Sequence, residues 1–210
     1  ASEGTGEVSA PLGATAVPAS LLRGLNPEQL AAVTLALLLP PGMLLARWLA
    51  YTEFKGKYLI EALVVLPLVL PPTVLGYYLL VFVGGASPLG QWLSQQFGVQ
   101  LAFHFSGLVL ASVIFNIPFL VQPIQRAFEA IPSHLGEAAA VSGLNAWQIF
   151  WRVELPLAWP GVLSAMVLTF VHTLGEFGVV LMIGGSIPGE TRTLAISIYD
   201  RVQAFDLVSA

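Results

Sequence analysis

The sequence predicts an all-α protein, a polytopic bundle of transmembrane helices. Hydrophobic residues make up 56% of its 210 residues and charged residues only 10%, too few charges to cover a soluble globule of this size. Four apolar segments, 29–50, 62–83, 101–125 and 157–183, each reach the roughly 20 residues that a helix needs to cross a bilayer. A membrane β-barrel would instead show alternating segments of about ten residues, and these runs are long and apolar on all sides.

Charge and composition exclude several classes of function. The net charge is −4 and no basic stripe is present, which argues against a nucleic-acid partner. The sequence contains no cysteine, and His104, His134 and His172 lie far apart without metal-ligand spacing, so no metal site is predicted. No phosphate-binding loop of the Gly-x-x-x-x-Gly-Lys-Ser/Thr type occurs, so any ATP hydrolysis must come from another chain.

The two ends of the chain differ from its middle. Residues 1–25 are expected to form a tail followed by a short interfacial segment, because they lack the basic flank and apolar core of a signal peptide. Pro27 is expected to open the first span. Residues 26–210 then form one transmembrane domain. Residues 206–210 look like the start of another apolar segment, so a final C-terminal helix is expected to be missing.

The distribution of basic residues predicts the orientation in the membrane. Arg47, Lys55 and Lys57 lie between the first and second segments, and Arg126 and Arg152 lie between the third and fourth. By the positive-inside rule both of these links are cytoplasmic. The link between the second and third segments has no Lys or Arg and belongs outside. The N-terminus and the chain after the fourth segment are then also external.

Prolines are concentrated in the second apolar segment. Pro67, Pro71 and Pro72 fall within six residues, and each removes a backbone donor and kinks a helix. In a membrane, freed carbonyl groups are tolerated mainly where they face protein or a water-lined cavity. We therefore expect Pro71, Pro72 and Thr73 to line or gate a path through the membrane. The alternative is that membrane helices simply carry more proline than soluble ones.

The link between the third and fourth segments contains a run of small residues. A short helix is expected to include Glu137, Ala138, Ala139, Ala140, Ser142 and Gly143. The alanines give it a thin face that fits a groove on a partner, and Gly143 is free to end it in the left-handed conformation. Ser133 is expected to cap its start, with Glu137 in the first turn. An ordinary amphipathic connector is the alternative interpretation.

Spacing favours the partner-binding interpretation. The sequence has Glu-Ala-Ala, then Gly143, then nine further residues, and then Val153-Glu154-Leu155-Pro156. This pattern resembles the motif of permease subunits of bacterial ABC importers. Val153 stands where that motif usually has isoleucine. The resemblance implies a type I importer fold in a bacterial inner membrane. It also implies a coupling helix that docks on a cytoplasmic dimer of ABC ATPases, which hold the ATP and Mg²⁺, and a homodimer of this chain.

Three further stretches narrow the resemblance. This chain is similar to the molybdate and tungstate permease family in three stretches, Leu66–Tyr77, Thr173–Gly178 and Pro188–Thr193. Sulfate permeases share the Gly-Glu-Phe or Gly-Glu-Tyr part, so permeases for sulfate or another oxyanion remain the alternative. The resemblance implies translocation of an oxyanion that an extracytoplasmic binding protein delivers, and it implies no cofactor in this chain.

Three polar residues are candidates for the gate and the translocation path. Glu176 is the only acid deep in an apolar run and needs a partner, such as a helix terminus or a tyrosine. Thr173 is assigned to the gate with it. Arg192 presents a fork of donors that suits an oxyanion in an external vestibule or at the binding-protein dock. The alternatives are a structural buried acid and a plain surface arginine.

Two other classes of protein, an intramembrane enzyme and a secondary transporter, fit the sequence less well. An intramembrane enzyme needs a nucleophile and a base, and Ser112, Ser164 and Thr169 have only His172, three residues after Thr169, at a plausible spacing. A secondary transporter would leave the motif from Glu137 to Gly143 unexplained. The sequence therefore favours an ATP-driven permease over both.

Overall fold

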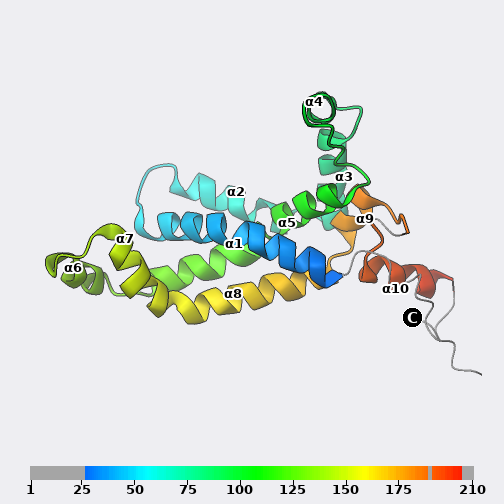
Figure 1. Ribbon diagram of the computed structural model, residues 1–210. Coiled ribbons are helices and arrows are strands. Elements are labelled where there is room, and N and C mark those ends of the chain that lie inside the picture. The colour runs from blue at the N-terminus through cyan, green and yellow to red at the C-terminus, as the bar shows by residue number, and fades with distance from the viewer. Residues whose placement is uncertain (1–26, 189–190, 205–210) are drawn as a thin grey trace, which may run out of the picture.

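The computed structural model describes residues 27–188 and 191–204, and every regular element in these ranges is a helix (Figure 1). Within them, three helices are long and apolar enough to cross a membrane, or four if one bent pair is counted as a span. The all-α prediction is confirmed. The predicted tail, residues 1–25, and the apolar start at residues 206–210 lie outside the described residues.

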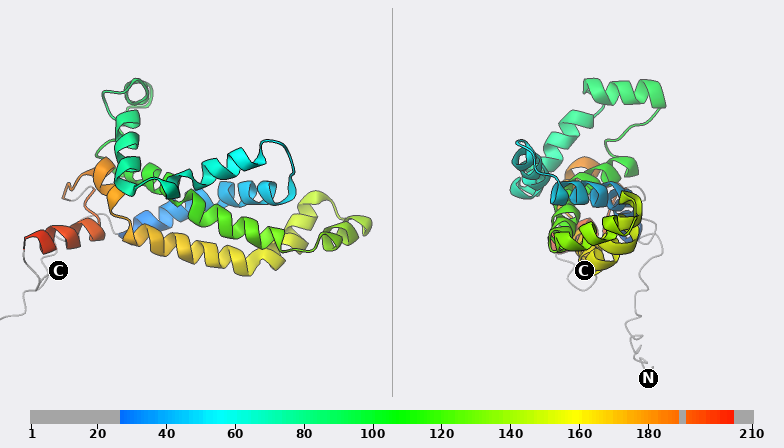
Figure 2. Two further views of the ribbon diagram at one scale, coloured as in Figure 1. Left: turned by 180° about the vertical axis from the view of Figure 1, so that it is seen from behind. Right: turned by 90° about the vertical axis from the view of Figure 1, so that its left-hand side faces the viewer.

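Three long helices form the body of the bundle. They are α1 (Pro27–Tyr51), α5 (Phe105–Glu129) and α8 (Leu155–Gly175), and they pack side by side (Figures 1 and 2). Their shared core contains fully buried side chains, among them Leu49, Leu120, Ile124, Phe128 and Val162. The described part of the first helix starts with Pro27, a residue that loses no helical hydrogen bond at the first position of a helix.

The second predicted span is broken into two helices. They are α2 (Lys57–Val69) and α3 (Pro72–Val83), and their axes differ by 107°. A continuous, kinked helix over 62–83 was therefore a wrong prediction. Leu70 and Pro71 both have extended backbone, with ψ of 137° and 135°, because the residue before a proline is excluded from the helical region. Two consecutive prolines thus end one helix and begin the next.

The fourth predicted span, 157–183, is also interrupted. Helical structure starts earlier, with α7 (Ala146–Ile149) and the π-helix η2 (Phe150–Glu154) leading directly into α8. It then stops at Gly175, because Glu176 has an extended ψ of 122°. The chain resumes as α9 (Gly178–Gly184). The apolar window was located correctly, and its continuity was predicted wrongly.

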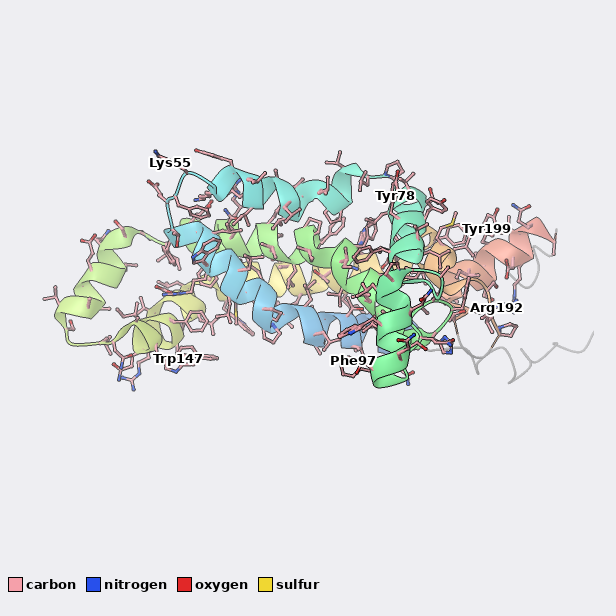
Figure 3. The ribbon with its side chains drawn as sticks, turned by 90° about the horizontal axis from the view of Figure 1, so that it is seen from above. Lys55, Tyr78, Phe97, Trp147, Arg192 and Tyr199 are labelled. Carbon is pink, nitrogen blue, oxygen red and sulfur yellow. The ribbon has the colours of Figure 1, made fainter. Side chains whose placement is uncertain are left out.

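The links between the helices gather at two opposite ends of the bundle. The loop from α1 to α2 lies near α6 (Ser133–Val141) and α7, and α4 (Pro88–Phe97), α9 and α10 (Leu194–Gln203) lie at the other end (Figure 1). In Figure 3, Lys55 and Trp147 accordingly lie far from Arg192 and Tyr199. The links predicted to be cytoplasmic therefore share one end, as an alternating membrane topology requires.

Cysteine labelling tests which end faces the cytoplasm. The sequence has no cysteine, so Val141→Cys, at a side chain that is 90% exposed on α6, gives a single reactive thiol. We expect a membrane-impermeant maleimide to label it only from the cytoplasmic side. Gln96→Cys, in exposed α4, should react only from outside, and Leu120→Cys, at a position that is fully buried, should not react. Labelling of Val141→Cys in intact cells would contradict the orientation.

Candidate functional site

The two interrupted spans meet where the candidate gate residues lie. Helix α3 packs against α9, and a Cβ atom on Gly178 would lie 3.0 Å from Pro72 Cβ and 3.2 Å from the Thr73 nitrogen. One turn further along α3, a Cβ atom on Gly76 would lie only 2.7 Å from Met182 Cβ. The approach at Gly76 needs a glycine, because any side chain would push α3 away from α9, and the contact at Gly178 is tight. The structure thus brings Pro72 and Thr73 against the segment that follows Glu176.

Pro71, Pro72 and Thr73 are exposed on the single chain, at the bend between α2 and α3. Pro71 is the residue before α3, and its carbonyl accepts hydrogen bonds from the Val74 and Leu75 nitrogens. The bend therefore has satisfied backbone groups and an accessible outer edge. This combination is compatible with residues that line a path, and their assignment to the path stays a prediction.

Glu176 is buried at the end of α8, with only 4% of its surface exposed. Its Oε2 accepts a hydrogen bond of 2.6 Å from the Ser112 hydroxyl and one of 3.4 Å from Asn116 Nδ2. Its Oε1 has no partner among the described residues. The expectation of a partner is confirmed, but the helix terminus or tyrosine proposed for that role was wrong. The partners are two polar side chains one turn apart on α5.

A chain of polar contacts extends from Glu176 back to α8. The Asn116 amide nitrogen also donates to the Ser112 carbonyl at 2.8 Å, and its Oδ1 lies 3.0 Å from His172 Nδ1. Since that oxygen can only accept, His172 must carry its proton on Nδ1. The His172 ring stacks on Phe119 with 3.7 Å between centroids. This network fixes the C-terminal end of α8 to the middle of α5.

The sequence contained a partial signal for this network. Ser112 was considered only as a nucleophile, and Asn116 was missed. Their spacing of four residues in an apolar segment places both on one helix face, which was the available clue. Thr169 Oγ1 has no hydrogen-bond partner in the described ranges, so the pair of Thr169 and His172 that the enzyme alternative considered is not formed.

Thr173 and Arg192 are not joined to this network. Thr173 is 3% exposed, and its hydroxyl donates to the Thr169 carbonyl within α8. Arg192 Nε donates to Ser186 Oγ at 3.0 Å, and its guanidinium lies 3.6 Å from Asp200. Thr173 therefore lines no open path in this conformation. Arg192 is held in a local cluster between α9 and α10, so its contact with an oxyanion remains a prediction.

The predicted coupling helix is present as α6 and begins earlier than expected. Its first residue is Ser133, and Pro132, with an extended ψ of 130°, takes the capping position instead. Ser133 makes no capping hydrogen bond, and Glu137 falls in the middle of the helix, so both of these local predictions were wrong. Gly143 has φ of +85°, which confirms the left-handed end.

The surface of α6 has the thin face that the sequence predicted. Glu137, Ala138 and Ala140 are exposed, whereas Ala139 is 8% exposed and faces the protein. Ser142 lies directly after the helix, and its hydroxyl donates to the Ala138 carbonyl at 2.8 Å. Apart from Glu137 itself, nothing bulkier than a valine stands on the exposed part of the helix from Glu137 to Val141. Docking of the ATPase on this face stays a prediction.

No group of three potential His, Cys, Asp or Glu ligands gathers within residues 27–188 and 191–204. The three histidines lie in separate places, with His104 Nδ1 3.0 Å from the Ala102 carbonyl oxygen and His134 exposed on α6. The main polar cluster of this site is thus the hydrogen-bonded network of Ser112, Asn116, His172 and Glu176. We call this network the polar latch, because it joins the end of α8 to α5.

Matched serine substitutions test the latch. Ser112→Ala removes a short hydrogen bond to a buried carboxylate, and we expect it to destabilise the protein by about 1.5–3 kcal/mol. Ser164→Ala is the control, because that hydroxyl is exposed and bonds only to the Pro160 carbonyl of its own helix, so about 0.5 kcal/mol or less is expected. The midpoint of thermal unfolding in detergent is measured for the Ser112→Ala and Ser164→Ala variants. Equal midpoints for both variants would disprove the latch.

Comparison with known proteins identifies the family. Residues 12–206 match the model of the binding-protein-dependent transport system inner membrane component. The molybdenum transport system permease protein ModB of Azotobacter vinelandii is 52% identical over 87% of this chain and 80% of its own length.

ModB of Escherichia coli K12 is 40% identical, over 79% of this chain and 72% of its own. The sulfate transport system permease protein CysT of Escherichia coli K12 is 34% identical, over 80% of this chain and 61% of its own. The crystal structure of a bacterial ABC transporter that imports the polysaccharide alginate aligns with a TM-score of 0.74 at 20% identity, over 90% of this chain and 70% of that one, which shows the fold. The chain belongs to the inner-membrane components of binding-protein-dependent transport systems, a family of multi-pass permeases that are not themselves ATPases.

Proposed function

We propose that this chain is the permease of an ATP-driven importer of molybdate. The observation that carries the proposal is the 52% identity, over most of both chains, to a molybdenum transport system permease protein. The identity to a sulfate permease is 34% and covers a smaller share of that protein, which favours molybdate over sulfate. Tungstate, a tetrahedral dianion of nearly equal size, is the closest competing substrate.

The geometry supports a path that opens at the interrupted spans. Substrate delivered at the end that contains α4, α9 and α10 would meet the bend at Pro71–Thr73, and α3 can move only together with α9 because of the close approach at Gly76. The latch between Glu176 and Ser112 holds the other side of the same junction. A carboxylate repels an oxyanion, so Glu176 has a structural role in the gate and does not bind the substrate.

Energy for transport comes from a partner. We propose that α6 is the coupling helix and that Glu137, Ala138 and Ala140 face a groove on a cytoplasmic ABC ATPase. A binding protein outside the membrane delivers the oxyanion, as the family description implies. Since an ATPase dimer offers two such grooves, we propose that two copies of this chain occupy them as a homodimer.

Transport by reconstituted protein tests the proposal. Proteoliposomes with the chain, its ATPase and its binding protein should take up labelled molybdate, and tungstate should compete whereas excess sulfate should not. Glu137→Arg should abolish uptake, because it places a cation on the docking face. Glu53→Arg is the control, with the same charge change on an exposed loop residue at the same end. Competition by sulfate would overturn the substrate, and uptake by Glu137→Arg would overturn the coupling helix.

Native mass spectrometry tests the homodimer. The purified complex should have the mass of two copies of this chain with two ATPase chains, because each α6 occupies one groove. Removing the ATPase should leave a species with two copies of this chain. A complex with one copy per ATPase dimer would contradict the proposal, since one groove would then be empty or filled by a different permease.

A further inference from the structure

An ion pair outside the candidate gate joins two long helical segments near the α6 end. Arg47, in the penultimate turn of α1, contacts Glu154, the last residue of η2, through two hydrogen bonds of 2.5 and 3.1 Å. Glu154 is 8% exposed. The other two ion pairs in the described ranges are local, Arg126 with Glu129 on one helix and Arg192 with Asp200 between α9 and α10.

Aromatic rings hold the Arg47 guanidinium in place. Its central carbon lies 5.6 Å from the Tyr51 ring centroid and 5.4 Å from that of Phe150, within the range of cation–π attraction. The Tyr51 hydroxyl donates to the carbonyl of the fully buried Phe128 at 3.3 Å. The fork of the guanidinium therefore has one orientation, and that orientation matches the Glu154 carboxylate.

Glu154 lies at the end of a helical segment that starts just after α6. Helix α7 begins with a capping box, in which the Asn145 side chain accepts from the Gln148 nitrogen at 2.9 Å and the Gln148 side chain accepts from the Asn145 nitrogen at 3.0 Å. The Trp147 and Phe150 rings stack with 5.8 Å between centroids. A displacement of α6 therefore reaches Glu154 through a short, well-ordered segment.

We infer that Arg47 and Glu154 are positioning residues that make α1 move together with α6 when the partner ATPase closes. The inference rests on the proposed function in one respect, which is that α6 is the helix on which the ATPase acts. The remaining contacts of α1 with α5 and α8 are largely apolar, and apolar contacts are non-directional, so they define the relative position of the helices less sharply than a hydrogen-bonded ion pair does. A bidentate ion pair allows one register, and sliding would leave the buried carboxylate without its partner.

The first test separates coupling from folding. In reconstituted transporter, Arg47→Gln and Glu154→Gln should lower the uptake per ATP hydrolysed between about threefold and thirtyfold, with ATP hydrolysis and assembly retained. Arg47→Lys, which keeps the charge without the fork, should fall between wild type and Arg47→Gln. Arg126→Gln is the control, because it breaks an ion pair that joins no two helices. A parallel loss of uptake and hydrolysis would show a merely structural role and overturn the inference, as would an unchanged ratio.

A distance measurement tests the same inference without any substrate. Spin labels at Leu44→Cys on α1 and Val141→Cys on α6 lie at side chains that are 55% and 90% exposed, and the chain has no other cysteine. With the labelled chain diluted by unlabelled copies, the distance within one chain should be the same with and without ATP. In Arg47→Gln it should change when ATP binds.

The two readouts keep the inference and the proposed function apart. If wild-type transporter takes up no oxyanion but the distance between the labels on α1 and α6 stays constant on ATP binding and varies in Arg47→Gln, the proposed substrate fails and the inference stands. If the distance in the wild type already changes with ATP, α1 does not follow α6, and the inference is overturned whatever the substrate.

Discussion

A lipid bilayer offers no water to the backbone, and this constraint determines where the chain can interrupt a helix. Two spans are interrupted, at Leu70–Pro71 and at Glu176–Phe177, and each break frees backbone groups that only protein can satisfy. The structure places α3 against α9, so that the two breaks are neighbours. The close approach at Gly76 belongs to this pairing, and Glu176, beside the second break, makes its hydrogen bonds with Ser112 and Asn116 of α5.

Hydropathy located the spans because it depends only on how many consecutive residues prefer lipid. It could not show the breaks, since an apolar window remains apolar whether its backbone runs straight or turns by 107°. Prolines marked the second span as unusual, but a kink and a break have the same sequence signal. The difference depends on α9, which supplies the surface against which α3 turns, and that surface is about 100 residues away in the sequence.

In the candidate site too, some features could be predicted from the sequence and others could not. Local features followed from the sequence, such as the left-handed Gly143 and the thin alanine face, because they depend on a few adjacent residues. The partners of Glu176 could not be derived, because Ser112 is 64 residues away and any polar side chain in three spans was eligible. The Arg47–Glu154 pair, 107 residues apart, was missed for the same reason. Packing of α1, α5 and α8 selects these pairs.

The π-helix η2 determines what a change in the length of the link between α6 and α8 does to the direction of α6. Each residue in an α-helix turns the chain by about 100°, and a π-turn holds one residue more than an α-turn. Deleting one residue between Phe150 and Glu154 would therefore restore a regular helix and leave the direction of α6 nearly unchanged, because the π-turn holds its additional residue within one turn. Deleting one residue from α7 while η2 stays a π-helix would instead turn α6 by about 100° around the axis of α8, and the exposed face of α6 would then point in another direction.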